Sequence, residues 1–200
     1  MLLLSRAKSN APRPGDRFRR DLVPRSFELV QCPENCLRRS DALLGLVARA
    51  GAGDKVLVEQ LYEYTHWGVS TSTRRTDPNL RLQAYVAAAR RGARVRILLD
   101  RHYDHPEEAR SNAKTCQFVN SLSARFDIQC RLGDPTGLGI HNKLVLVKAG
   151  TTGYVHLGSI NGSETSNKLN RELATQLKSL AAFRYWARVF HYDWSVSSAP

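Results

Sequence analysis

The sequence predicts an α/β fold, with a mixed β-sheet flanked by helices on both faces. Strand-like and helix-like segments alternate from about residue 33 onward, as they do in folds that cover a sheet with helices. One helix-like segment joins two strand-like segments, and such a unit gives parallel pairing. With 200 residues, of which 42% are hydrophobic, the chain is long enough for one sizeable domain and too short for two ordinary ones.

The first predicted elements are a helix and a strand. Pro33, Glu34 and Asn35 open the helix, whose apolar residues follow helical spacing as far as the turn at residues 51–53. Residues 55–62 (KVLVEQLY) then have the composition of a strand. Within this largely apolar stretch, Glu59 is expected either to enter a functional pocket or to form an ion pair.

A βαβ unit follows. An Asp-Pro pair opens a helix over residues 77–91, and Gly92 ends it. Residues 94–100 (RVRILLD) form the next strand, which we expect to pair in parallel with the strand at 55–62. The alternation continues with a helix within residues 107–124 and a short strand at 128–132.

The C-terminal third predicts a hairpin, one more strand and a helix. Residues 140–147 (IHNKLVLV) and 154–159 form the strands of the hairpin, and residues 148–153 form its turn. A last strand near residues 171–177 leads into a helix with an apolar face. That face carries Phe183, Trp186, Ala187 and Phe190.

The chain is strongly basic. Lys and Arg number 30 against 18 Asp and Glu, which gives a formal net charge of +12. The expected partner is therefore anionic: a nucleic acid, an anionic membrane surface or a phosphorylated small molecule. A merely basic, solvated surface is the alternative, since net charge informs about partners and not about the fold.

Residues 1–30 are predicted to be a flexible basic N-terminal arm, and residues 31–200 to be the folded domain. The arm is rich in Lys, Arg and Pro and shows little apolar periodicity. Four apolar residues at its start are too few for a signal peptide, and no run of eighteen apolar residues predicts a membrane span. The location is left open, with the cytoplasm as the default.

Four cysteines predict neither a secreted disulfide framework nor a metal site. At this length they are too few for such a framework, and a C-x3-C pair without a second close pair is a poor zinc signature. We expect mostly buried thiols and no metal. The residues are Cys32, Cys36, Cys116 and Cys130.

One constellation of residues indicates chemistry. Because side chains alternate along a strand, His141 and Lys143 are expected on the same side of the strand at 140–147. The returning strand brings Ser159 beside them, after a glycine that permits close approach. Asn161 then offers amide NH2 groups to a phosphoryl oxygen.

These groups suit nucleophilic displacement at phosphorus. A neutral imidazole attacks, and the charge that develops on the oxygens is stabilised by Lys143, Asn161 and Ser159. A carboxylate should hold the proton on the other ring nitrogen of His141, and Glu172 is the candidate for that role. The proposed chemistry needs no metal and no cofactor.

His-x-Lys at 141–143, Gly158-Ser159-Ile160-Asn161 and the later Asn170-Arg171-Glu172 resemble the phospholipase D superfamily of HKD phosphodiesterases. The resemblance extends from about residue 33 to residue 194. It implies a phospholipase D-like fold and a covalent phosphohistidine on His141. It also implies that Lys143 and Asn161 bind phosphate, Ser159 supports them and Glu172 orients the histidine.

The chain departs from the family pattern in three ways. Lys148 stands where the motif has Asp, although parity places this residue on the side of the strand opposite to His141 and Lys143. The spacing from Lys143 to Gly158 is three residues longer, in a turn where insertions cost little. Only one His-x-Lys motif is present, whereas the family's site uses two. A homodimer, or pairing with a second HKD half, would supply the other histidine.

The function predicted from the sequence is that of a phospholipase D-like phosphodiesterase acting through His141. Its anionic substrate is a phospholipid head group or a nucleic acid, between which the basic surface does not discriminate. The alternative is a catalytically degenerate HKD half-domain that binds anionic phosphates or pairs with another half-domain.

Overall fold

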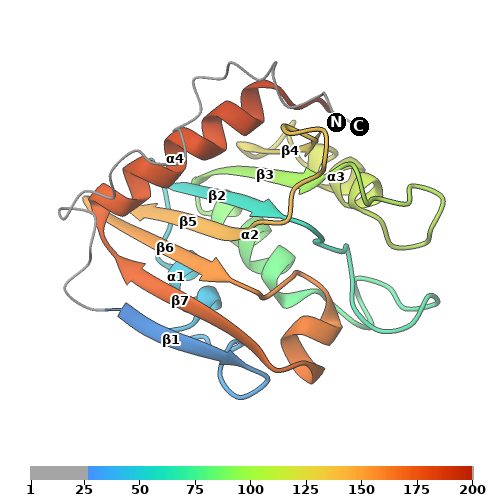
Figure 1. The fold of residues 1–200 in the computed structure, drawn as a ribbon, viewed down its shortest axis with the longest axis horizontal. Coiled ribbons are helices and arrows are strands. Elements are labelled where there is room, and N and C mark those ends of the chain that lie inside the picture. Colours follow the sequence, from blue (N-terminus) through green and yellow to red (C-terminus); the bar gives the residue numbers. More distant parts are fainter. Residues whose placement is uncertain (1–26, 200) are drawn as a thin grey trace, which may run out of the picture.

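A computed structural model describes residues 27–199, so most of the predicted arm at residues 1–30 lies outside the described residues. The centre is a seven-stranded sheet with strand order β1-β7-β6-β5-β2-β3-β4 (Figure 1). The strands are β1 (Phe27–Cys32), β2 (Lys55–Gln60), β3 (Arg94–Asp100), β4 (Ile128–Gly133), β5 (Lys143–Ala149), β6 (Thr152–Gly158) and β7 (Glu172–Lys178). The helices are α1 (Leu43–Ala48), α2 (Leu80–Arg90), α3 (Asn112–Asn120), α4 (Leu180–Ser195) and the π-helical turn η2 (Thr165–Leu169). None of the helices among the described residues has the length and apolar character needed to cross a membrane.

Helices cover both faces of the sheet, as the sequence predicts. Helices α1, α2 and α3 pack on one face, and α4 lies across the other (Figure 1). Along β5, Val145 and Val147 join the core beneath α1 and α2, whereas Leu144 and Leu146 join the core beneath α4. The α/β prediction is confirmed, with one apolar core on each side of the sheet.

The strand pairing brings one terminus each of β5, β6 and β7 to the same end of the sheet. β2, β3 and β4 are parallel, with α2 and α3 as their connections, which confirms the predicted βαβ unit. β5, β6, β7 and β1 are joined by antiparallel pairings, and β5 and β6 form the predicted hairpin. The start of β5, the end of β6 and the start of β7 therefore lie at the same end of the sheet.

Strand β1 is missing from the sequence prediction. Residues 27–32 pair with β7, so residues 27–30 belong to the sheet and not to an arm. Val30 and Cys32 are buried, whereas Phe27 and Leu29 on the other side of the strand are exposed. Because both sides are largely apolar, the sequence shows no alternation that would reveal the strand.

The first helix begins later than the sequence predicts. Residues 33–41 form turns and irregular chain, and α1 starts only at Leu43. The Asn35 side chain accepts a hydrogen bond from the Gln31 backbone NH at 2.9 Å. Such a local side-chain bond stabilises a turn in competition with a helix, which explains the error.

The cysteines are paired as Cys32–Cys36 and Cys116–Cys130, so the expectation of thiols is wrong, although all four residues are buried. The second pair joins α3 to β4, where packing of the helix on the strand brings the two Cα atoms to 4.8 Å. Their sequence positions alone do not reveal this contact.

Candidate active site

The His141–Lys143 segment lies where β5 begins. The predicted strand at 140–147 is wrong at its start, because β5 begins only at Lys143. His141 and Asn142 precede the strand and are exposed, whereas Lys143 is buried. The Lys143 Nζ donates a hydrogen bond to the His141 carbonyl oxygen at 2.7 Å. The imidazole and the ammonium thus belong to one short segment, but the imidazole is carried by a loop.

A buried carboxylate holds this loop in place. Asp100, the last residue of β3, is fully buried and accepts a hydrogen bond from the Ile140 NH at 2.5 Å and another from the Tyr103 NH at 2.6 Å. Gly139 has a φ of 83°, and a Cβ there would lie 2.6 Å from an Asp100 carboxylate oxygen. The loop can therefore approach Asp100 only because residue 139 is a glycine. No pattern in the sequence indicates this role for Asp100.

Ser159 and Glu172 meet at the same edge of the sheet. Ser159 follows the last residue of β6, and its hydroxyl donates a hydrogen bond to the carboxylate of Glu172, the first residue of β7. Ser159 Oγ also accepts a hydrogen bond from the Leu173 NH at 3.1 Å. Burial lowers the pKa of Lys143, and the nearby Glu172 carboxylate opposes this shift. Lys143, Ser159 and Glu172 therefore form one polar group at the ends of three adjacent strands.

The predicted contact between Glu172 and the histidine is not formed within the described residues. The Glu172 carboxylate accepts its hydrogen bond from Ser159, and the imidazole of His141 makes no hydrogen bond to it. His141 is exposed to solvent. The orienting role of Glu172 therefore stays a prediction.

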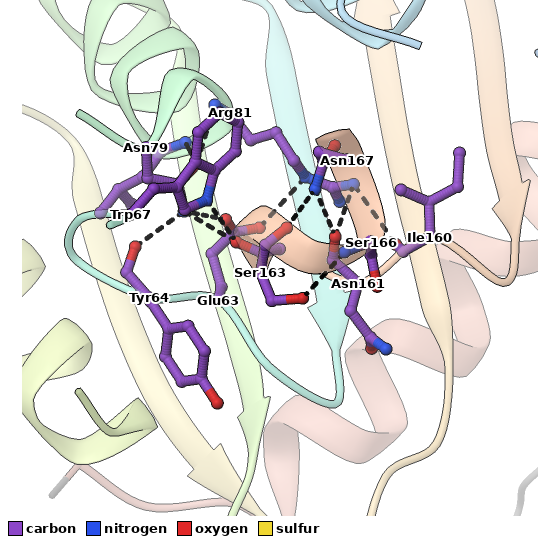
Figure 2. Close-up of polar contacts among 12 residues, drawn as sticks. Glu63, Tyr64, Trp67, Asn79, Arg81, Ile160, Asn161, Ser163, Ser166 and Asn167 are labelled. Carbon is purple, nitrogen blue, oxygen red and sulfur yellow. Dashed lines mark hydrogen bonds and ion pairs between the residues drawn. The ribbon is translucent and has the colours of Figure 1, made fainter. Parts of the chain in front are cut away.

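Asn161 lies in the loop that follows Ser159. Its backbone carbonyl accepts hydrogen bonds from the buried side chains of Asn167 at 2.8 Å and Arg81 at 3.4 Å. Its amide oxygen is buried without a hydrogen-bond partner among the described residues. Figure 2 shows the Asn161 side chain pointing away from the polar cluster that holds its backbone. This cluster, centred on Glu63 and Arg81, was not identified from the sequence.

Lys148, which stands where the family motif has aspartate, lies far from these groups. Lys148 is near the other end of β5, five residues from Lys143, and this span corresponds to ~16 Å of extended strand. It lies on the α4 side, as its neighbour Leu146 does, whereas Lys143 lies on the opposite side, as Val145 does. The Lys148 ammonium donates a hydrogen bond to the Gly150 carbonyl at 2.8 Å. The parity expectation is confirmed for Lys148 relative to Lys143, whereas His141 lies outside the strand.

Glu59 does not form the expected ion pair. It is fully buried, accepts a hydrogen bond from the Asn142 side chain at 2.6 Å and faces the carboxyl group of Asp193 on α4. Burial, followed by the charge of Asp193, raises the pKa of Glu59 to about 8. Burial and the nearby Asp193 thus favour the neutral form of Glu59, whose carboxyl oxygen holds the Asn142 side chain next to His141.

This carboxyl pair predicts a loss of stability in mild alkali. The folded-state pKa of Glu59, about 8, lies above the ordinary value of 4.5. The contribution of Glu59 to the free energy of unfolding is therefore fully present below pH 4.5 and is lost as the pH rises to about 8. Glu59→Gln keeps the acceptor for Asn142 and removes the titration. We expect its thermal unfolding midpoint to exceed that of the wild type at pH 9 and to approach it at pH 5. A variant at an exposed carboxylate, Glu107→Gln, is the control. Parallel pH curves for wild type and Glu59→Gln would contradict the assignment.

Three arginines and one histidine away from this site have structural roles. Arg91 donates to the carbonyls of Val47 and Ala50, both at 3.0 Å, and Arg94 and Arg96 form ion pairs with Asp127. They are thus engaged in contacts within the chain. His156 is buried, and burial lowers its pKa to about 3, so it is a neutral core residue. Among residues 27–199, no group of three or more His, Cys, Asp or Glu side chains is arranged to hold a metal ion.

Comparison with protein families and solved structures gives consistent results. Residues 63–194 match the family model described as "Cardiolipin synthase, PLD-like domain". NucT from Helicobacter pylori is similar in structure, with a TM-score of 0.65 and 16% identity over 88% of this chain and 99% of that one. Nuc, a phospholipase D family member from Salmonella typhimurium, has a TM-score of 0.62 and 19% identity over 88% and 97% of the two chains.

A third similar structure belongs to a longer protein. The phosphatidylserine synthase of Haemophilus influenzae Rd KW20 has a TM-score of 0.60 and 13% identity, over 89% of this chain but only 41% of the synthase chain. No curated protein matches this chain. At such identities, the similarity to solved structures establishes the fold and leaves the substrate open.

Proposed function

Because the chain belongs to the family of phospholipase D-like domains, we propose that it cleaves or transfers at a phosphodiester bond through a covalent phosphohistidine on His141. The observation that carries this proposal is the group formed by Lys143, Ser159 and Glu172 at one edge of the sheet, beside the loop of His141. His141 would be the nucleophile, Lys143 the cation and Glu172 the carboxylate around one position for a phosphate.

The reaction follows from these groups. A neutral ring nitrogen of His141 forms a bond to phosphorus while the bond to the leaving oxygen breaks. Lys143, Ser159 and the Asn161 amide stabilise the charge that develops on the phosphoryl oxygens. Glu172 stabilises the charged imidazole after attack. Water, or an alcohol in a transfer reaction, then displaces the phosphoryl group from His141 and completes the cycle.

Trapping the intermediate tests this proposal. The chain is incubated with a phosphodiester that carries a ³²P label, quenched in alkali and separated under denaturing conditions. We expect one label per site, stable in alkali, released by acid and mapped to His141. A catalytically degenerate half-domain, which is the second candidate function, binds phosphate without incorporating label. Complete absence of label from a chain that turns over substrate would overturn the covalent mechanism.

The leaving oxygen requires a proton, which a second histidine must supply. The chain contains one His-x-Lys motif, and proton transfer by a positioned group contributes roughly 100- to 10,000-fold to a rate. We propose that a second copy of the chain, or a separate HKD half, brings this histidine to the exposed edge at His141.

Mass measurement in solution tests the pairing. A twofold dimer should have twice the mass of 22.5 kDa by light scattering, and specific activity should fall on dilution below its dissociation constant. A chain that is monomeric and fully active at the same concentration would show that pairing is not needed. A monomer without activity that gains activity on mixing with another HKD half would favour the heterologous arrangement.

A further inference from the structure

A buried ion pair lies behind the loop that carries Asn161. Glu63 follows β2, and Arg81 lies in the first turn of α2, with 3.5 Å between the Glu63 carboxylate and Arg81 Nε. Their side chains are 0% and 1% exposed, respectively. Charged groups are rarely buried to this degree unless they are paired, because desolvation of each charge is costly. The pair therefore calls for an explanation beyond general stability, to which buried ion pairs contribute little.

The surroundings of this pair give that explanation. We define the Asn161 loop as residues 160–163, and each of its four carbonyl groups accepts a hydrogen bond from a buried side chain (Figure 2). Arg81 Nη1 donates to the carbonyls of Ile160 at 3.3 Å and Asn161 at 3.4 Å. Asn167, from η2, donates to the carbonyls of Asn161 at 2.8 Å and Ser163 at 2.7 Å.

The remaining carbonyl of the loop, that of Gly162, has two donors. Trp67 Nε1 donates to it at 3.0 Å and Asn79 Nδ2 at 3.1 Å. Asn79 also donates to Glu63 Oε1 at 2.6 Å, and its own side-chain oxygen caps the N-terminus of α2. Gly162 packs against the Glu63 carboxylate so closely that a Cβ would lie 2.3 Å from it. Glu63 thereby links the cap of α2, the guanidinium and the loop.

The arrangement leaves the Asn161 amide free while fixing the backbone on both sides of it. The loop has its carbonyl groups on the side of Arg81 and Glu63, and the Asn161 amide points away from them (Figure 2). The Asn161 amide oxygen is buried and engaged by no hydrogen bond within the described residues, and the amide NH2 group is the donor that would meet a phosphoryl oxygen. A side chain that stays free while its backbone is held by buried donors is preorganised for a ligand.

We propose that Glu63 and Arg81 are positioning residues for the phosphodiester reaction, which hold the Asn161 loop so that the Asn161 amide meets the phosphoryl oxygens. This inference rests on the proposed function, because Asn161 must bind phosphate for the positioning to matter. Glu63 and Arg81 are themselves buried and do not contact the substrate. Their effect on the reaction passes through the backbone carbonyls of the loop.

The test removes the guanidinium without leaving a buried charge alone. In the double variant Glu63→Gln with Arg81→Met, the glutamine oxygen still accepts from Asn79, the Ile160 carbonyl loses its donor, and the Asn161 carbonyl keeps only Asn167. We expect backbone amides of residues 160–163 to exchange hydrogen for deuterium faster, and inorganic phosphate to bind roughly tenfold more weakly or worse, because small displacements of a positioned group have large effects. With a phosphodiester substrate, kcat/KM should fall by a similar factor.

Arg91→Met provides the matched control. Arg91 also lies at α2 and donates from its guanidinium to two backbone carbonyls, but those carbonyls belong to the α1 region. This variant should keep wild-type phosphate binding, activity and exchange of the Asn161 loop. If the double variant fails to fold, Arg81→Lys replaces it, because lysine keeps a cation beside Glu63 and loses the planar fork of guanidinium donors to the loop carbonyls.

A cycle with Asn161→Ala separates positioning from general damage. If Glu63 and Arg81 act through Asn161, their replacement should change kcat/KM and phosphate binding by less than about twofold once Asn161 is alanine. Equal effects in both backgrounds would overturn the proposal, as would unchanged exchange of residues 160–163 in the double variant. A wild-type chain that neither binds phosphate nor hydrolyses phosphodiesters would overturn the proposed function, a result distinct from either of these.

Discussion

Replacing His141 with alanine is expected to abolish phosphodiester turnover and leave the fold intact. The histidine is exposed in the loop before β5, and its ring makes no hydrogen bond within the part of the chain that the structure describes. Its removal therefore leaves no cavity and no unpaired buried group, and the free energy of unfolding should change by less than about 0.5 kcal/mol. Loss of the nucleophile should reduce kcat by roughly 10⁴-fold or more.

Initial rates on bis(p-nitrophenyl) phosphate and the thermal unfolding midpoint measure these two quantities. His105→Ala is the matched control, since His105 is another exposed loop histidine, with 65% of its side chain accessible. It should retain the wild-type rate. Undiminished hydrolysis by His141→Ala would refute the assignment of the nucleophile.

Glu172→Gln is expected to lower kcat by ~100-fold with little change in KM, in the range typical of proton-handling groups. The glutamine oxygen can still accept the hydrogen bond of Ser159. It lacks the charge that favours the imidazolium formed when His141 attacks. The loss should therefore fall on the chemical step and not on binding.

The same variant should alter the pH profile. Burial lowers the pKa of Lys143 and the Glu172 carboxylate opposes this shift, so removal of the charge lowers the pKa further. Since the reaction uses the ammonium form, activity is lost as the pH rises through this pKa. The alkaline limb of kcat/KM should thus move to lower pH in Glu172→Gln and stay in place in Glu107→Gln. Identical rates and pH profiles would exclude Glu172 from the mechanism.

Local patterns in the sequence were sufficient to predict much of this fold. The bounds predicted for the strand at residues 94–100 are confirmed, because Gly92 ends the preceding helix and the apolar stretch Ile97–Leu99 stops at Asp100. Strand β1 was missed because Phe27 and Leu29 are apolar although exposed. The start of β5 was misplaced because the Asp100 contact that holds Ile140 outside the strand joins residues 40 positions apart.

In the candidate site too, some features are predictable from the sequence and others are not. Lys143, Ser159 and Glu172 were expected together, and pairing of β5, β6 and β7 does bring them to one edge. Asp100, which holds the loop of His141, and Arg81, which holds the Asn161 loop, are not predicted from the sequence. A buried charge is recognised as a support only from its partners, and the two carbonyls that Arg81 binds lie 79 and 80 residues away in the chain. Neither composition nor periodicity carries such information.

Gly158 is needed for the geometry of the site, although it takes no part in the proposed reaction. A Cβ at this position would lie 2.2 Å from the Leu173 carbonyl oxygen, on the neighbouring strand. The separation of Ser159 from Glu172 therefore depends on a missing methyl group as well as on the hydrogen bonds of Ser159 to Glu172 and Leu173. A chain with alanine here would keep every chemically active side chain and still hold two of them too far apart. Such a chain would contain every reacting residue and yet be inactive, because its strands could not assemble the site.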